Sequence, residues 1–332
     1  LFTVVFGFPG VTYGHSGHSN HDQSNSKDSS HHRSTSAENQ LLELTRTGTV
    51  DEVKQALNQV DTADVETKFG ITPLMIAAEQ NNAAVVQELI DAGANVNAES
   101  QKKTTPLIYA SAFNDSSVLH TLLDAGAKLR VRNGRGATPL MMAAQYTSPE
   151  VVQLLLNEGA EVQSTDKLGL SPLMFAGANN SDTRVLELLL EAGADINRTD
   201  DNGFTPVRLA VYAGNSEDVI RYLIDRGAWA LGKDQRGNSL LMAAAQSPVS
   251  HEITRWIVEE GARIDSKDRQ NRTPLMLAAG SGKTKDVKFL LKHGADVNVE
   301  DKMGKTPLIH AIQYNDNPDA VVQTLLKHGA ET

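Results

Sequence analysis

The chain of 332 residues contains no cysteine. Disulfides, thiolate metal sites and a cysteine nucleophile are therefore excluded, although this absence leaves the redox compartment open. Aromatic side chains are also scarce, with two Trp, six Tyr and eight Phe. Acidic residues outnumber basic ones and give a formal net charge of -10. Any position that gathers aromatic or basic side chains therefore stands out in this chain.

A phrase that reads Thr-Pro-Leu-Met-Ile-Ala-Ala at its first occurrence, from Thr72 to Ala78, returns at intervals of 33 or 34 residues. A Gly-Ala pair keeps nearly the same period, from Gly93 to Gly329. Self-similarity at this period indicates a stack of repeated structural units. The eight copies of the phrase begin at Thr72, Thr105, Thr138, Ser171, Thr205, Ser239, Thr273 and Thr306.

The unit that contains Thr138 indicates two antiparallel helices. Thr followed by Pro favours a helix start, because the hydroxyl can accept a bond from a free backbone N–H and Pro needs no donor there. Apolar residues from Val151 to Leu156 recur at a spacing of three and four, the stripe of a second amphipathic helix, and Gly159 is typical of its end. Each unit is therefore predicted to be a helix-turn-helix, and Leu140 is predicted to lie in its core.

A short polar stretch separates each Gly-Ala pair from the next Thr-Pro. Its first residue can close a local side-chain turn in every copy, and Gly follows three residues later except at Lys103 and Asn271. These stretches are predicted to form tight hairpin tips. Their first residues are Thr67, Ser100, Asn133, Asp166, Asp200, Asp234, Asp268 and Asp301.

These motifs resemble the ankyrin repeat, through Gly-x-Thr-Pro-Leu-x-x-Ala-Ala and through Leu-Leu-x-x-Gly-Ala-Asp-Val-Asn at Leu290 to Asn298. The resemblance is to a bacterial-type member with an exported N-terminus. It implies an all-α ankyrin-repeat solenoid of stacked helix-turn-helix units with hairpin-like loops over residues 37–332. A degenerate unit is expected over residues 37–66. Eight repeats are expected to start near residues 67, 100, 133, 166, 200, 234, 268 and 301.

One departure from the family pattern is systematic. The position three residues after Thr is usually His in ankyrin repeats, but no copy in this chain has His there. We expect its residues to pack between repeats, with a methionine-based redox role as the alternative. They are Met75, Ile108, Met141, Met174, Arg208, Met242, Met276 and Ile309.

The N-terminal residues differ from the repeats. Residues 1–14 begin with an apolar run, Leu1 to Phe8, and resemble the end of a secretory signal peptide, which predicts a periplasmic or secreted protein, with a cytoplasmic one as the alternative. No transmembrane segment is expected in the mature chain. Residues 15–36 are rich in Ser, Asn and His and are predicted to be a disordered tether. Its weak metal-ligand candidates include His15, His18 and His21.

The catalytic signals in the sequence are incomplete. Gly282-Lys283-Thr284 is similar to the end of a phosphate-binding loop, but Leu277 stands where that motif requires its first Gly. The segment also falls at the turn between the two helices of a repeat. His251-Glu252 begins a zinc-protease motif without the second His. A non-enzymatic protein without a cofactor is therefore expected.

The resemblance implies that hairpin tips and first-helix ends line a concave partner-binding face. Aromatic residues recur at those helix ends and favour recognition, although each could instead cover the adjacent repeat. Basic residues at the tips predict attraction of an acidic protein, although ordinary solvated charge is the alternative. The candidate partner-binding residues are Phe113, Tyr146, Tyr212, Tyr314, Arg132, Arg135, Arg236, Arg269 and Lys302.

The function predicted from these residues is a monomeric scaffold or inhibitor that binds another protein. Nucleic acid is not expected as a partner, because acidic residues at the tips would repel phosphates. The alternative function is metal handling by the His-rich tail.

Overall fold

The computed structural model describes residues 36–80, 82–113, 116–228 and 232–331. The predicted signal-peptide remnant, the tail up to residue 35, and the metal-ligand candidates His15, His18 and His21 lie outside these residues. The first helix begins at Ser36, one residue before the boundary that the sequence predicted for the repeats.

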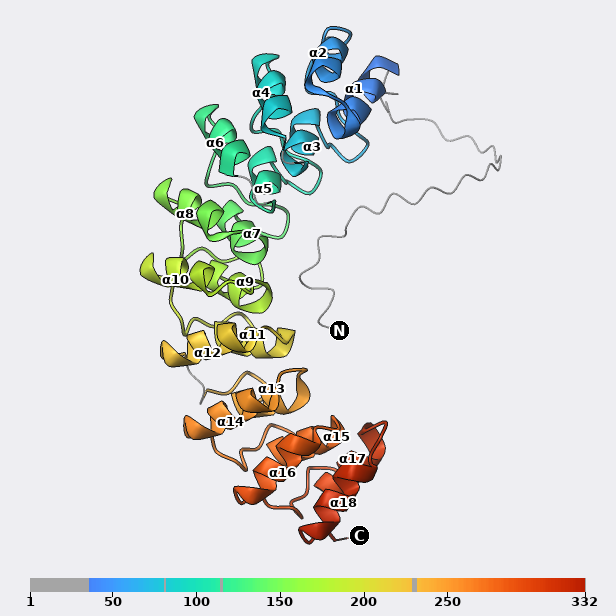
Figure 1. Ribbon diagram of the computed structural model, residues 1–332, viewed down its shortest axis with the longest axis vertical. Coiled ribbons are helices and arrows are strands. Elements are labelled where there is room, and N and C mark those ends of the chain that lie inside the picture. Colours follow the sequence, from blue (N-terminus) through green and yellow to red (C-terminus); the bar gives the residue numbers. More distant parts are fainter. Residues whose placement is uncertain (1–35, 81, 114–115, 229–231, 332) are drawn as a thin grey trace, which may run out of the picture.

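The described residues form a curved stack of helix pairs with no strand, which confirms the predicted all-α solenoid. The first helix of each pair, together with the hairpin tips, lies on the concave side of the curve (Figure 1). We call these the inner helices: α1 (Ser36–Thr47), α3 (Pro73–Glu79), α5 (Pro106–Ala110), α7 (Pro139–Tyr146), α9 (Pro172–Asn179), α11 (Pro206–Ala213), α13 (Leu240–Gln246), α15 (Pro274–Gly280) and α17 (Pro307–Tyr314).

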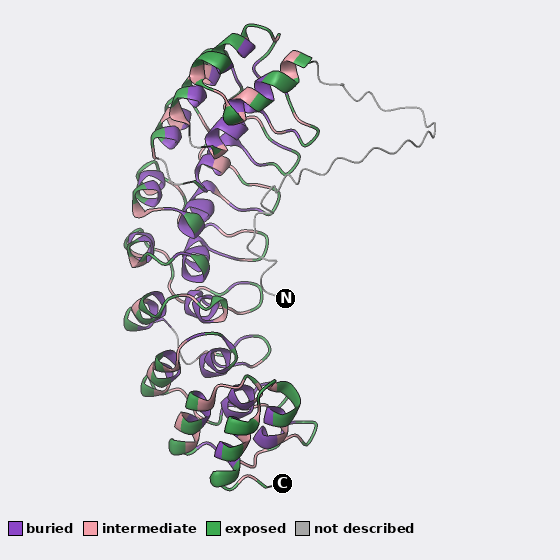
Figure 2. Ribbon diagram, turned by 45° about the vertical axis from the view of Figure 1, so that its right-hand side comes forward, coloured by how far each residue is buried: buried purple, intermediate pink, exposed green. Residues whose placement is uncertain are grey.

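The second helix of each pair forms a convex outer layer (Figure 1). These outer helices are α2 (Val50–Leu57), α4 (Ala83–Asp91), α6 (Ser116–Asp124), α8 (Pro149–Asn157), α10 (Thr183–Glu191), α12 (Glu217–Asp225), α14 (His251–Glu259), α16 (Thr284–Lys292) and α18 (Asp319–Lys327). The core lies between the two layers and between successive pairs (Figure 2). Leu140 on α7 and Val151 and Leu155 on α8 are fully or almost fully buried, as predicted.

The inner helices begin as their Thr-Pro phrases predict. The Thr138 hydroxyl accepts a hydrogen bond from the backbone N–H of Met141 at 3.3 Å, and Pro139 occupies the first helical position. Ser239 caps α13 in the same way although Leu, not Pro, follows it. Thr205 makes no such side-chain bond at the start of α11. A proline after the cap residue is therefore neither required for the cap bond nor sufficient for it.

The methionines that stand three residues after the Thr or Ser cap, where no copy has His, are all fully buried. In four repeats the methionine sulfur also lies 3.4 Å from the backbone N–H of the cap residue and accepts a hydrogen bond from it. Packing therefore accounts for these residues, and sulfur supplies an acceptor at the position that an imidazole usually occupies in this kind of repeat. The four are Met141, Met174, Met242 and Met276.

The hairpin tips close by the predicted side-chain turn. In the tip of the fifth repeat, Asp200 Oδ1 accepts hydrogen bonds from the N–H groups of Asn202 at 2.9 Å and Phe204 at 2.7 Å. Gly203, which lies between these two residues, has a φ of 80°, a conformation that favours glycine. Lys103 and Asn271 adopt the same left-handed conformation, with φ of 55° and 61°. The two tips without glycine therefore keep the same turn, although a left-handed conformation is strained for residues other than glycine.

In some repeats, polar side chains at the turn between helices also join the repeat to the previous one. The Asn180 amide donates to the carbonyls of Ala144 and Thr147, which belong to the end of the preceding inner helix and the turn after it. Lys283 reaches back similarly and donates to the carbonyl of Ala244 at 2.8 Å and to that of Val249 at 3.1 Å. These bonds satisfy carbonyls that the helix itself leaves free.

Candidate functional site

Backbone hydrogen bonds tie neighbouring hairpin tips into one continuous ribbon along the concave side. The donor is the backbone N–H of the residue four positions before the Thr or Ser cap of one repeat. The acceptor is the carbonyl of the residue three positions before the cap of the preceding repeat. For example, the Arg269 N–H donates to the Arg236 carbonyl at 3.0 Å, and the Lys302 N–H donates to the Gln270 carbonyl at 2.9 Å. The tips therefore hold their side chains in register from one repeat to the next.

Three of the four predicted aromatics occupy one equivalent position, eight residues after the cap. Tyr146 and Tyr314 are the last residues of α7 and α17, and Phe113 lies in the turn after α5. Phe113 is 39% exposed, Tyr146 is 41% exposed and Tyr314 is 56% exposed. Large apolar side chains with this exposure are available to a partner, which matters in a chain with so few aromatics. Phe113 and Tyr146 lie in adjacent repeats, whereas Tyr314 lies in the last repeat described.

Tyr212 differs from the prediction, which treated it as another exposed aromatic. It stands seven residues after Thr205, and one residue changes the direction of a helical side chain by about 100°. It is therefore half-buried, and its ring lies against Phe204 with 5.4 Å between centroids. Burial raises the pKa of the Tyr212 hydroxyl, although nearby Arg208 opposes this effect. Tyr212 packs within the array rather than projecting from it.

All five predicted basic residues are exposed at or beside the tips, and within the described residues four of them have side chains that make no hydrogen bond or ion pair. These four are Arg135, Arg236, Arg269 and Lys302. Arg132 was predicted with them but is engaged within the array. Its Nη1 donates to the carbonyls of Gly136 at 3.0 Å and Thr165 at 2.6 Å. Arg132 therefore joins two repeats.

The acidic residues at the tips are mostly turned inward. Asp200, Asp234, Asp268 and Asp301 are buried by the turns that they close. The basic side chains beside them are therefore more prominent on the surface than the sequence suggested. The acids of the second helices instead lie on the outer layer, where Glu150, Glu158 and Glu259 are exposed. These three acids thus lie on the layer opposite the hairpin tips.

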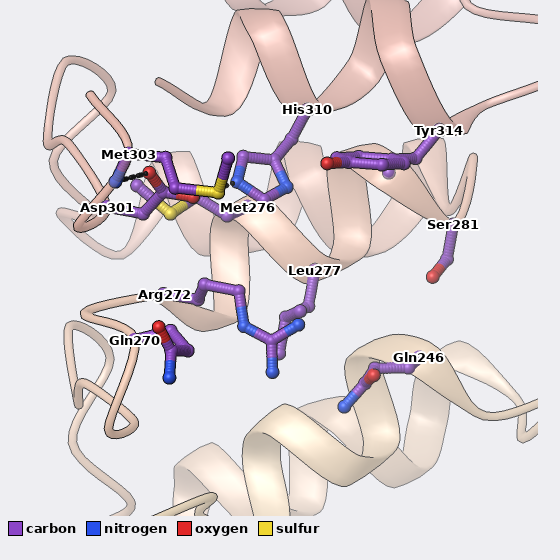
Figure 3. Close-up of a pocket in the computed structure, with 11 residues that line it drawn as sticks. Gln246, Gln270, Arg272, Met276, Leu277, Ser281, Asp301, Met303, His310 and Tyr314 are labelled. Carbon is purple, nitrogen blue, oxygen red and sulfur yellow. Dashed lines mark hydrogen bonds and ion pairs between the residues drawn. The ribbon is translucent and has the colours of Figure 1, made fainter. Parts of the chain in front are cut away.

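A hollow of about 410 Å³ opens on the inner layer between α13, α15 and α17 (Figure 3). Its lining includes Gln246, Arg272, Leu277, Met303, His310 and Tyr314. Four residues of this hollow come from hairpin tips, namely Gln270, Arg272, Asp301 and Met303. Met303 occupies the same tip position as Phe69 and Leu168, which are also exposed. Sequence reasoning missed this second apolar position, although its spacing from the caps would have revealed it.

One carboxylate lies among the described residues that line the hollow, and it already has partners. Asp301 Oδ2 lies 3.0 Å from His310 Nε2, and both side chains are buried. Burial raises the pKa of the Asp301 carboxyl, but hydrogen bonds from the N–H groups of Lys305 and Met303 and from His310 outweigh it and lower that pKa below its ordinary value. The hollow therefore presents no uncommitted acid.

The described residues contain no group of three or more His, Cys, Asp or Glu side chains that could hold a metal ion. None of their helices has the length and apolar character needed to cross a bilayer. What the concave side offers is contact chemistry, namely exposed aromatics, basic tips and an open hollow.

Comparison with known proteins agrees with this architecture. The family model described as "Ankyrin repeats (3 copies)" matches residues 41–133, 112–200, 177–268 and 241–332. A protein of Carollia perspicillata, "Ankyrin repeat, SAM and basic leucine zipper domain-containing protein 1", is 39% identical over 57 residues. That match covers 17% of this chain and 12% of the relative's length. The family matches span nearly all of the described helices, and the chain belongs to the ankyrin repeat family.

Proposed function

We propose that this protein is a non-enzymatic scaffold or inhibitor that holds another protein against its concave face. Ankyrin repeats are in general modules for protein–protein interaction. The observation that carries the proposal is the alignment of Phe113, Tyr146 and Tyr314 at one exposed position beside a ribbon of free basic tips. Exposed aromatics and arginines are the side chains that most often anchor an interface.

The surface charge favours a protein with an acidic surface as the partner. Arg135, Arg236, Arg269 and Lys302 are exposed and uncommitted, while the acids of the neighbouring tips are buried. A partner with carboxylates facing this ribbon would be attracted before contact. Monomeric action and the absence of nucleic acid partners remain part of this proposal.

The alternative function and the location both depend on residues 1–35. Metal handling would require His15, His18 and His21, and export would require the segment from Leu1 to Phe8. No described residue favours metal handling, so we propose protein binding as the function. A periplasmic or secreted location is proposed with it, on the apolar character of that segment alone.

The first test replaces both Phe113 and Tyr146 with Ala. The chain and the variant are used to capture proteins from extracts of the source organism, and the captured protein is identified by mass spectrometry and titrated by calorimetry. We expect the double variant to bind at least about tenfold more weakly, since truncating an interface anchor commonly costs 2 kcal/mol or more. Thermal unfolding should change little, because both side chains are partly exposed.

The matched control is Tyr222→Ala, an aromatic truncation on the outer helix α12. Tyr222 lies beside Arg226, whose guanidinium carbon is 4.7 Å from the ring centroid. This variant should retain the affinity of the unmodified chain. Equal affinity of the Phe113→Ala, Tyr146→Ala variant and the unmodified chain for the captured protein would contradict the assignment of the concave face.

A further inference from the structure

The hollow between α13, α15 and α17 has two exposed apolar walls. Met303 at the tip is 74% exposed and Tyr314 at the end of α17 is 56% exposed, and both line the hollow with Leu277 of α15 (Figure 3). Apolar side chains that are this exposed around an open cavity gain the most when another apolar group displaces water from it. The shape and lining therefore suit one bulky apolar side chain.

Arg272 brings a positive charge to the same hollow. Its Nε pairs with Asp268 Oδ2 at 2.7 Å, and its side chain is 35% exposed. Its two Nη atoms make no hydrogen bond within the described residues, and the guanidinium is turned into the hollow (Figure 3). Pairing through Nε fixes the plane of the guanidinium and leaves the edge formed by its two Nη atoms free, and that edge can bind a carboxylate with two parallel hydrogen bonds.

The surroundings of the hollow add further positive charge. Arg269 and Lys302 are exposed on the adjoining tips, and the Lys305 ammonium lies 5.0 Å from the centroid of the Tyr314 ring while donating to its hydroxyl at 2.6 Å. Among the described lining residues the acid is Asp301, and His310 and two backbone N–H groups already bind it. The hollow thus combines apolar walls with several basic side chains at and around its rim.

We propose that this hollow recognises an acidic segment of a partner protein that places a bulky apolar side chain between Met303, Leu277 and Tyr314 and a neighbouring carboxylate on Arg272. The inference rests on the proposed protein-binding function and names the chemistry of the partner. Charge complementarity supplies the carboxylate, and the exposed walls supply the requirement for an apolar neighbour. A nucleic acid fits less well, because its backbone offers charge without an aliphatic group for the walls.

The test selects binders from a phage-displayed library of random peptides, with the full chain as the target. Enriched sequences should carry Asp or Glu within one or two positions of Leu, Met, Phe or Trp. The most enriched sequence is then synthesised with a fluorescent label and titrated by fluorescence polarisation. A labelled single-stranded oligonucleotide is titrated as the second probe and should bind at least about tenfold more weakly than the peptide.

Two variants locate the binding. Arg272→Gln removes the charge that receives the carboxylate, and Ser281→Trp fills the hollow from an exposed lining position without removing a contact that the structure shows. Each variant should bind the peptide at least about tenfold more weakly than the unmodified chain. The matched control is Asn179→Trp, which adds the same bulk at the equivalent exposed position of α9, outside the lining, and should change the affinity by less than about twofold.

Enriched peptides without acidic residues, unchanged binding by the Ser281→Trp variant, a failure to enrich any sequence, or tighter binding of the oligonucleotide would each overturn this inference. Such failures are distinguishable from failure of the proposed function, which is tested by the captured protein and by Phe113 and Tyr146. These two residues lie in the second and third repeats, whereas the hollow is formed by the sixth to eighth. If capture succeeds while selection fails, the hollow alone loses its assigned role.

Discussion

Asp286→Ala is expected to lower the free energy of unfolding by about 3 to 5 kcal/mol, because it removes one partner of a buried ion pair and leaves the other without compensation. The Asp286 side chain is 1% exposed. Its Oδ1 lies 2.6 Å from His251 Nδ1, and its Oδ2 lies 2.9 Å from the Lys283 ammonium as an ion pair. Since His251 begins α14 and Asp286 lies on α16, one carboxylate joins two successive outer helices.

The loss extends beyond the carboxylate itself. Lys283 is held where its ammonium also donates to the carbonyls of Ala244, Ser247 and Val249. Without Asp286 the Lys283 side chain, which is 18% exposed, has neutral acceptors alone. The bonds that tie α15 and α16 to the preceding repeat should therefore weaken together.

Urea unfolding followed by tryptophan fluorescence and circular dichroism measures this effect. The control is Asp225→Ala on α12, where the carboxylate is 65% exposed and lies 3.6 Å from Arg221. An exposed pair of this kind contributes about 1 kcal/mol or less. A loss below about 1 kcal/mol in both variants would mean that the buried group does not hold the two repeats together.

Leu140→Ala is expected to cost about 2 to 5 kcal/mol of stability, as a large-to-small change in a packed core. Leu140 is 1% exposed on α7, and the residues around it, including Ala143 and Val151, are fully buried. The side chains of a stacked array are shared with the neighbouring repeats, so the cavity should also weaken the contact between units.

Leu168→Ala provides the matched control, because it makes the same chemical change at an exposed tip. This variant should remain within about 0.5 kcal/mol of the unmodified chain. Both are compared by urea unfolding at one protein concentration. Equal stability of the two variants would contradict the placement of Leu140 in the core.

Much of the fold follows from local chemistry that the sequence displays. The Thr138 cap, the apolar stripe of α8 and the turn closed by Asp200 each depend on residues within about five positions of one another. Such short-range rules are enough to predict the helices and tips. The period then implies that each unit packs on the next, which predicts the solenoid.

The candidate site was predicted less completely, because its geometry depends on side-chain direction and on contacts between repeats. Tyr212 was misjudged because a shift of one residue turns it into the array. Arg132 was misjudged because its acceptor on Thr165 lies 33 residues away. The hollow draws Gln246, Arg272 and Tyr314 from three repeats, and no local motif brings these residues together.

The central claim is that the concave side binds a protein, and hydrogen–deuterium exchange of the captured complex tests it most directly. Amides of the hairpin tips and of the exposed ends of α5, α7 and α17 should exchange more slowly in the complex than in the free chain. Amides of the outer helices α8, α12 and α14 should be unchanged. Protection confined to the outer helices, with the tips exchanging as they do in the free chain, would contradict the account.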